Sequence, residues 1–245
     1  MQKPNQCLCT PQEITQLGTI LSVWAHPDDE SYSCAGIMAA ATQNGQRVVC
    51  LTATKGELGV QDESRWPAAR LADIRAEEMM GALKALGLAE HHWLGYHDGG
   101  CDRVPANEAV AKIKAFIADI KPNTILTFGP DGMTGHPDHQ TVSKWVDQAV
   151  RGTDITVYHA VQEEQVYVDF LEEADKKFNI FFNIDKPPLR KTDTCAIALN
   201  VTGELLNKKY AALKAMPSQT EAILSSTPKE QLNRMLTIEC FVTAK

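Results

Sequence analysis

The sequence predicts an α/β protein in which helices cover both faces of a mainly parallel sheet. Short aliphatic and β-branched runs alternate with longer segments of helical period, the order expected of strand, helix and strand units. The 245 residues suffice for one such domain with a full hydrophobic core. A composition of 44% hydrophobic and 22% charged residues is typical of globular proteins and argues against disordered or fibrous classes.

The expected elements alternate most regularly before residue 160. Strands are expected at 19–24, 47–54, 92–96, 123–128, 155–161 and 195–199, with FNIFFNI at 178–184 as a further candidate. Helices are expected at 33–44, 66–87, 105–120, 139–151, 203–215 and 228–235. We expect a single domain over residues 1–245, with 1–17 as a mobile N-terminal segment.

Two segments have clear local signals. In the helix expected at 66–87, apolar residues recur near a 3.6-residue period and indicate core packing rather than a binding groove, with Gly87 as the C-cap. These residues are Ala72, Ala76, Met79, Met80, Leu83 and Leu86. DKPPLRKTD at 185–193 predicts a loop, because adjacent prolines break both helix and sheet.

Charge and hydropathy limit the classes of partner. The net charge of -7 and the isoelectric point of about 5.5 argue against nucleic acid, whose binding needs a basic face. A small neutral or cationic ligand fits better. No apolar stretch reaches the ~18 to 20 residues that span a bilayer, and MQKPNQCLCTPQE lacks the apolar core of a signal peptide. We therefore expect a cytoplasmic protein.

The seven cysteines do not form a disulfide framework in this interpretation. Their number is odd, and several lie in apolar runs such as VVCLTA and TCAIAL, which favours reduced, buried thiols. Cys7 and Cys9 form a CxC pair, but the second ligand pair that a structural zinc site needs does not follow in the sequence.

Two clusters of histidine and carboxylate residues carry the strongest functional signal. AHPDDE contains His26, Asp28, Asp29 and Glu30, and GHPDH contains His136, Asp138 and His139. Each cluster follows a predicted strand, TILSVWA in the first case and TILTFG in the second. Loops after the carboxyl ends of parallel strands converge on one edge of the sheet, so the two clusters can meet in space.

Histidine and carboxylate side chains on a rigid frame are ligands that zinc prefers. His26 and Asp29 are three residues apart and can point the same way from a tight turn, so that a distant histidine completes a set of three. Asp28 must then point elsewhere, toward the water that the metal activates, as a general base. Of His136 and His139, one can bind the metal while the other stabilises an oxyanion.

Each cluster alone has a simpler interpretation. An Asp-Asp-Glu run most often begins a helix, where the macrodipole favours acidic side chains. HPDH alone is more often a helix start with surface histidines. Together the clusters favour a metal site, because His26, His136 and His139 all lie beside acids after buried strands.

The paired motifs make the chain resemble the PIG-L/LmbE-like family of zinc-dependent N-acetylglucosaminyl deacetylases. Further matches lie in TATKGELG, in the R-x-E-E run at Arg75–Glu78, in LGYHDGG at 94–100 and in AALKAMPSQ at 211–219. The likeness spans roughly residues 19–220. It implies a Rossmann-like, three-layer α/β/α fold and an amino-sugar substrate.

The resemblance also implies roles for individual residues. His26, Asp29 and His139 would bind the zinc, for which Fe²⁺ is the alternative, and Asp28 would be the general base. His136, oriented by Asp138, would stabilise the tetrahedral oxyanion. Arg75 and Asp98 would line the substrate pocket, and Glu30 would brace the metal loop. Asp28 or His136 would protonate the leaving amine. Thr134 and Met216 depart from the family pattern at positions that leave the metal ligands and the base untouched.

The leading hypothesis is therefore a zinc-dependent hydrolase that removes an N-acetyl or other N-acyl group from an N-acetylglucosamine-containing small molecule. The alternatives are an amidase for another sugar conjugate and a non-catalytic, metal-dependent sugar-binding protein. A dinucleotide-binding oxidoreductase is disfavoured, because the acids of AHPDDE would repel a pyrophosphate. The sequence leaves a homo-oligomer open.

Overall fold

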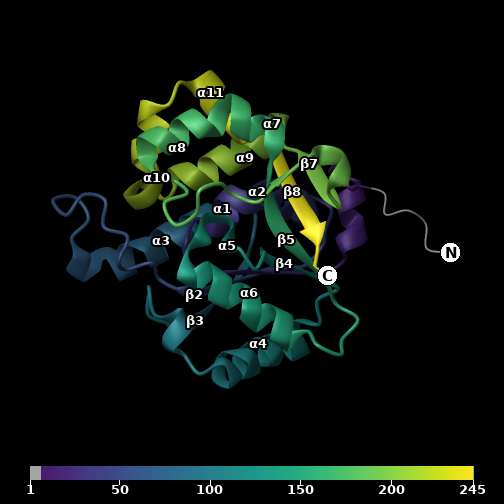
Figure 1. The fold of residues 1–245 in the computed structure, drawn as a ribbon. Helices are drawn as coiled ribbons and strands as arrows, with labels where there is room; N and C mark the ends of the chain where they lie inside the picture. Colours follow the sequence, from purple (N-terminus) through teal and green to yellow (C-terminus); the bar gives the residue numbers. More distant parts are fainter. Residues whose placement is uncertain (1–6, 245) are drawn as a thin grey trace.

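The structure is a computed structural model that describes residues 7–244. It contains a mainly parallel sheet (Figure 1), as the sequence predicts. The strands follow the order β3 (Glu90–Tyr96), β2 (Val48–Thr54), β1 (Ile20–Trp24), β4 (Thr124–Phe128), β5 (Thr156–Glu163), β8 (Ile238–Thr243) and β7 (Ile197–Asn200). The strands from β3 to β5 are parallel, whereas β8 is antiparallel to β5 and to β7. The short β6 (Leu189–Arg190) pairs with β5 beside this path.

Helices form a layer on each side of the sheet. One layer contains α4 (Ala106–Ile120) and α6 (Pro137–Ala149), at the bottom of Figure 1. The other is built around α9 (Gly203–Lys214), which packs against α1 (Asp29–Ser33), α2 (Ala35–Gln43), α3 (Ala68–Leu86) and α10 (Pro217–Ser226). The remaining helical segments are η1 (Glu13–Leu17), η2 (Cys101–Arg103), α5 (Gly132–Gly135), α7 (Glu164–Val166), η3 (Tyr167–Leu171), α8 (Glu172–Phe178), η4 (Thr192–Thr194) and α11 (Lys229–Met235).

The core lies between these layers. All residues of β1, ILSVW, and of β4, TILTF, are buried, as expected of central parallel strands covered on both faces. In α3, Met79, Leu83 and Leu86 are buried and Gly87 ends the helix at φ 86°, which confirms the predicted stripe and C-cap. Met80 is an exception to the stripe: its side chain is 51% exposed.

Two expectations differ from the structure. The segment 178–184 is not a strand: Asn179 ends α8 in a left-handed conformation and the Asp175 carboxylate accepts the N–H of Phe181, so the chain turns. A second difference is β8, which the sequence patterns did not indicate. In the N-terminal segment, the described part packs on the fold, and Ile14 and Leu17 are buried. Leu8 bridges to Ile197 in β7, and the residues before position 7 lie outside the described part.

The sheet has a topological switch point between β1 and β4. From β1 the chain builds β2 and β3 on one side and then returns to place β4 on the other. The loops that follow β1 and β4 therefore diverge at neighbouring carboxyl ends, the position where open α/β sheets bind ligands. AHPDDE follows β1 and GHPDH follows β4, so the fold brings both clusters to this edge.

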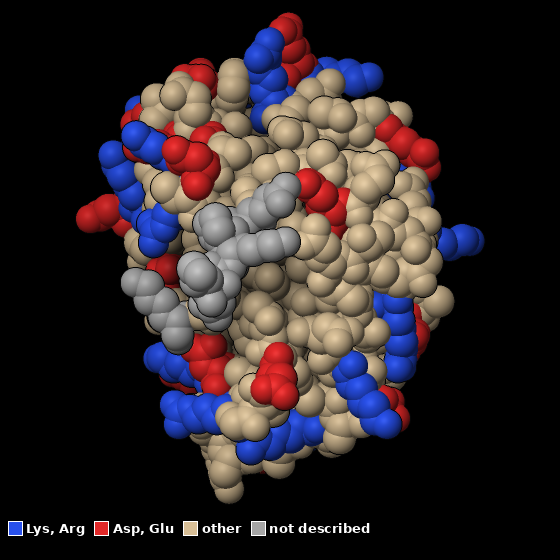
Figure 2. All heavy atoms as spheres, turned by 90° about the vertical axis from the view of Figure 1, so that its right-hand side faces the viewer, with Lys and Arg blue, Asp and Glu red and all other residues tan. Residues whose placement is uncertain are grey.

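One face of the molecule illustrates how its charges are distributed. Figure 2 shows a face on which acidic and basic side chains are interspersed around a largely uncharged centre, without a continuous basic area. Within residues 7–244, no helix has both the length and the apolar character that crossing a bilayer requires. All seven cysteines are free thiols, as predicted.

Candidate metal centre and catalytic pocket

The AHPDDE segment forms the tight turn between β1 and α1. The His26 backbone N–H donates to the Asp29 carboxylate at 2.7 Å, which closes the turn. Asp28 sits at φ 99°, an unfavourable conformation for a residue with a Cβ. Its N–H donates to buried Glu30 at 3.2 Å, so Glu30 braces the loop as expected. Because of this strained turn, the side chains of Asp28 and Asp29 point in different directions.

GHPDH forms the start of α6. His136 is the N-cap, and its Nδ1 accepts the N–H of Asp138 at 3.1 Å, with Pro137 at the first helical position. His139 lies one turn further along, where its ring stacks on Phe128 of β4 with centroids 4.1 Å apart. The helix start and the aromatic contact hold the two imidazoles on the side of α6 that faces the first cluster.

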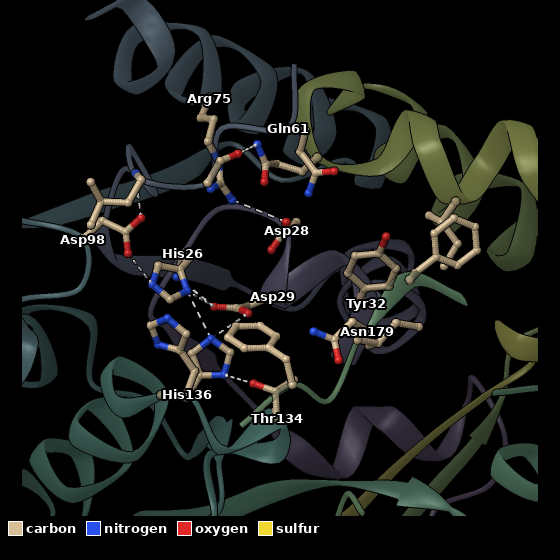
Figure 3. Close-up of a pocket in the computed structure, with 18 of the residues that line it drawn as sticks. His26, Asp28, Asp29, Tyr32, Gln61, Arg75, Asp98, Thr134, His136 and Asn179 are labelled. Carbon is tan, nitrogen blue, oxygen red and sulfur yellow. Dashed lines mark hydrogen bonds and ion pairs between the residues drawn. The ribbon is translucent and has the colours of Figure 1, made fainter. Parts of the chain in front are cut away.

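Three side chains from the two clusters converge on one point. Figure 3 labels His26 and Asp29, whose contact is drawn as a dashed line. Nδ1 of His26 lies 3.1 Å from Nε2 of His139. The Asp29 carboxylate oxygens lie 3.7 Å from the former nitrogen and 3.4 Å from the latter. All three residues are buried. The predicted metal ligands are therefore brought together although the histidines are 113 positions apart.

Hydrogen bonds fix the tautomers of both rings. Nδ1 of His139 donates to the Gly132 carbonyl at 2.9 Å, so its Nε2 carries a lone pair. Nε2 of His26 lies 3.0 Å from Asp98 and 3.3 Å from Asp138, so it donates to these carboxylates and directs Nδ1 inward. Two nitrogen lone pairs beside a carboxylate repel one another unless a positive charge lies between them. This donor set fits a divalent cation.

The acid–base properties agree with this fit. Burial works to lower the pKa of His26, but hydrogen bonds to Asp138 and Asp98 raise it to about 10. Burial, with the neighbouring His26, holds the pKa of His139 well below its usual range. Without a metal, the pair therefore shares one proton, on His26. A metal ion that binds both rings replaces that proton.

Asp98 and Asp138 orient His26 rather than forming a second metal site. Two groups of three residues, which share His26, have ligand atoms within 4.8 Å of one another. The first group is completed by His136 and His139, and the second by Asp98 and Asp138. In the second group the carboxylates already accept peptide N–H groups: Asp138 from Gly99 at 2.7 Å and Cys101 at 3.0 Å, and Asp98 from Leu58 at 2.9 Å. Metal-bound histidines are commonly held by such carboxylates.

Asp138 contacts two of the histidines through different groups. Its peptide N–H bonds to His136, the ring that it is expected to orient, whereas its carboxylate lies against His26. The reason is the helix: the first turn of α6 directs this side chain toward the loop after β3, where Gly99 and Cys101 receive it. Asp98 lies at the edge of the pocket, as expected, and also holds His26.

Asp28 lies next to Arg75. The Arg75 guanidinium is 3.3 Å from the Asp28 carboxylate and also donates to the carbonyls of Gly56 at 2.7 Å and Pro27 at 2.5 Å. Arg75 is thus buried and braces the loop as well as lining the pocket. Burial raises the pKa of Asp28 to about 7, although the Arg75 charge works in the opposite direction. A carboxylate with such a pKa suits proton transfer near neutral pH.

These residues surround a cavity of about 470 Å³. Its lining includes every candidate residue named above except Asp138 and Glu30, and adds residues that the sequence patterns did not indicate. Among the additions are Tyr32, Gln61, Asn179 and Phe182, with Gln219 from the late AALKAMPSQ motif. Gln219 was within reach of sequence reasoning, because it belongs to a quoted motif.

The AALKAMPSQ motif at 211–219 and the R-x-E-E run at 75–78 are joined by hydrogen bonds. The Glu78 carboxylate accepts the N–H of Ser218 at 3.0 Å and its hydroxyl at 2.5 Å, and the Gln219 amide donates to Gly59 at 2.9 Å. These contacts fix α10 against α3 and place Gln219 at the pocket. Both motifs therefore shape the site from outside the metal centre.

The comparisons with known proteins assign the family. Residues 21–150 match the family described as "PIG-L: GlcNAc-PI de-N-acetylase". The "Probable N-acetyl-alpha-D-glucosaminyl L-malate deacetylase 2" of Bacillus cereus is 30% identical over 220 residues, which cover 88% of this chain and 90% of that protein. The chain belongs to the PIG-L family, as the motifs indicated.

A second curated relative matches over a shorter region. The "1D-myo-inositol 2-acetamido-2-deoxy-alpha-D-glucopyranoside deacetylase 1" of Catenulispora acidiphila is 36% identical over 151 residues. The match covers 53% of this chain and 47% of that relative, so it spans about half the relative's length.

Solved structures confirm the fold. The N,N'-diacetylchitobiose deacetylase of Pyrococcus horikoshii has a TM-score of 0.66 at 20% identity, over 94% of this chain and 85% of that chain. GalB of Pseudomonas putida, a 4-carboxy-2-hydroxymuconate hydratase, has a TM-score of 0.63 at 18% identity. The match covers 93% of this chain and 96% of that chain. The fold thus occurs with different reactions, so it does not by itself determine the reaction of this protein.

Proposed function

We propose that this protein is a zinc-dependent hydrolase that removes an N-acyl group from a glucosamine-containing small molecule. The observation that carries the proposal is the convergence of two imidazole lone pairs and the Asp29 carboxylate beside a second carboxylate, Asp28. Family membership supports it, since both curated relatives described above are named as deacetylases of glucosaminyl compounds. A cytoplasmic location and a homo-oligomer stay predictions.

His26, Asp29 and His139 would hold the metal. A divalent cation there would polarise the amide carbonyl and acidify a water molecule. Two nitrogen donors and one oxygen donor suit zinc, and Fe²⁺ is the alternative. Asp98 and Asp138 keep the His26 ring in the orientation that metal binding needs.

Asp28 would act as the general base. Its side chain lines the pocket beside the ligand set without converging on it, and its pKa of about 7 lets it accept a proton from the attacking water at neutral pH. Arg75 favours the charged form of this carboxylate and fixes the loop that carries it. A bound dication would favour the charged form further.

His136 would stabilise the oxyanion as a neutral donor. Burial, with the neighbouring His26, lowers the pKa of His136, and its Nδ1 accepts the Asp138 N–H. The single ring proton therefore lies on Nε2, where it can donate to a developing negative charge. A neutral ring has no further proton to release, so Asp28 returns its proton to the leaving nitrogen.

The test is release of free amine from N-acylated glucosamines. Protein stripped of metal and reloaded with one equivalent of zinc or, without oxygen, of Fe²⁺ is incubated with a panel of these compounds. We expect amine release with at least one metal, none after chelation, and recovery on reloading. The metal is kept at one equivalent, because a teicoplanin deacetylase of similar fold is described in a zinc-inhibited form.

The outcomes separate the alternatives. If the panel is bound but no amine appears over hours, the non-catalytic sugar-binding protein is favoured. If larger sugar conjugates are hydrolysed and simple N-acyl glucosamines are not, the amidase alternative is favoured. If neither binding nor hydrolysis occurs with either metal, the proposal is wrong.

A further inference from the structure

A second cavity, of about 220 Å³, adjoins the candidate metal centre. Asp29, Tyr32, Thr134, His139, Ile180 and Ile223 line both this cavity and the larger pocket described above. The two spaces therefore share a wall that includes Asp29 and His139, two of the candidate metal ligands. A group bound at these ligands lies within reach of both spaces.

The two spaces differ in chemistry. The larger pocket combines charged and amide side chains, among them Asp28, Arg75 and Gln219, with apolar ones such as Leu58 and Phe182. Beyond the ligand end, the walls of the smaller cavity are mostly aliphatic and aromatic. They come from three hydrophobic clusters: Phe128 from the main core, Leu171 and Phe181 from the cluster around η3, and Leu232 and Leu236 from the cluster around α11. Such a cavity suits an apolar group.

A scissile amide also has two chemically different sides. The nitrogen carries the polar sugar, and the carbonyl carbon carries the acyl chain. With the carbonyl at the candidate metal ligands, the charged and amide groups of the larger pocket match the sugar, and the apolar cavity matches the chain. An acetyl group would put only one methyl group into the cavity, whereas an apolar cavity of about 150 Å³ already holds a benzene molecule.

We propose that the smaller cavity is an acyl-chain site, and that the protein prefers N-acyl groups of about four to eight carbons to acetyl. This inference rests on the proposed function and specifies its substrate class. Water adds its oxygen to the carbonyl carbon, the C–N bond breaks, and a proton passes to the nitrogen. The products are a medium-chain carboxylic acid and a free amine.

The first test compares kcat/KM for N-acetyl-, N-butanoyl-, N-hexanoyl- and N-octanoylglucosamine. Each buried methylene should raise kcat/KM up to about fourfold, so hexanoyl should exceed acetyl by at least about tenfold. If acetyl is preferred and kcat/KM falls with each added methylene, the acyl-chain site is wrong while the proposed hydrolase stands.

A pair of variants tests the location of the site. Leu171→Phe fills the cavity and should lower the ratio of kcat/KM for hexanoyl to that for acetyl by about tenfold or more. Leu189→Phe is the matched control, because Leu189 packs on the same cluster without lining the cavity. The ratio compares two substrates of one preparation, so partial loss of folded protein does not alter it. An unchanged ratio in Leu171→Phe overturns the assignment.

A binding measurement tests the acyl-chain site without requiring catalytic turnover. Hexanoate and acetate are titrated into the metal-loaded wild-type protein and into Leu171→Phe. The wild type should bind hexanoate at least about tenfold more tightly than acetate, and Leu171→Phe should lose this preference. Equal affinities in the wild type contradict the acyl-chain site, even if no sugar in the panel is hydrolysed.

Discussion

Nδ1 of His26 and Nε2 of His139 face each other at 3.1 Å, each with its other ring nitrogen hydrogen-bonded to an acceptor. The contact arises because β1 and β4 are neighbours at the switch point of the sheet. One histidine cluster follows β1 at once, and the other follows β4 after a short loop and α5. Two imidazoles held in this way form a site that needs a positive charge. The proposed function follows from that requirement and from the carboxylates around it.

Metal binding should release protons. Hydrogen bonds to Asp138 and Asp98 outweigh burial and keep the pKa of His26 at about 10, so the metal-free ring is charged at pH 7. A metal ion must displace that proton, and its affinity should therefore rise with pH between about 6 and 8. Titration calorimetry in buffers of different ionisation enthalpy should give at least about one proton released per metal at pH 7. A buffer-independent enthalpy would contradict the tautomers described here.

Arg75→Gln should shift the acid limb of the pH–rate profile to higher pH. Arg75 favours the charged form of Asp28, which is the form that acts as a base, so its removal raises the pKa of Asp28. The variant should lose more activity at pH 6 than at pH 8 when kcat/KM is measured across this range. Arg65→Gln, at an exposed pair with Glu221, is the control and should keep the wild-type profile. An unshifted limb in Arg75→Gln would exclude Asp28 as the titrating base.

Asp138→Asn should weaken metal binding about 10- to 100-fold. The carboxylate accepts two peptide N–H groups and the His26 ring, and an amide cannot accept all three. Competition with a chromogenic chelator measures the affinity, and circular dichroism checks the fold. Asp102→Asn, an exposed substitution in η2, should bind metal as the wild type does. If Asp138→Asn bound metal with wild-type affinity, Asp138 would not be needed to hold the His26 ring in place.

Glu239→Gln should lower the free energy of unfolding by about 3–5 kcal/mol. Glu239 and Lys209 form a buried ion pair at 2.8 Å, and Glu239 also accepts the N–H groups of Gly36 and Ile37 at the start of α2. The substitution leaves the Lys209 charge buried without its partner. Urea unfolding measures the change. Glu204→Gln, at an exposed pair with Lys208, should cost about 1 kcal/mol or less, and similar losses in both variants would contradict this account.

The sequence predicts β1 and β4 well, because these central strands are buried along their whole length and consist of aliphatic, aromatic and small hydroxyl residues. The strand β8 is harder to see, because Glu239 interrupts its apolar run and is neutralised by Lys209, thirty positions away. FNIFFNI misleads for the opposite reason. Its aromatic residues resemble a strand, but Phe181 packs inward while Phe182 is 58% exposed in a turn.

The candidate metal centre is largely predictable and the lining of the pocket is not. Local spacing and strand order suffice to bring His26, Asp29 and His139 together. The contact of Asp138 with His26 depends on where the loop after β3 presents its N–H groups, which no motif shows. The acyl-chain cavity is formed where segments from Phe128 to Leu236 leave a gap, so only the three-dimensional packing reveals it.

The central claim is that Asp28 acts as a base beside a metal held by His26, Asp29 and His139. The most direct test measures metal content and amine release on the same preparations of wild type and Asp28→Asn. We predict about one metal per chain in both proteins and a kcat that is about 10²- to 10⁴-fold lower in Asp28→Asn. Wild-type turnover in the metal-loaded variant would contradict the account.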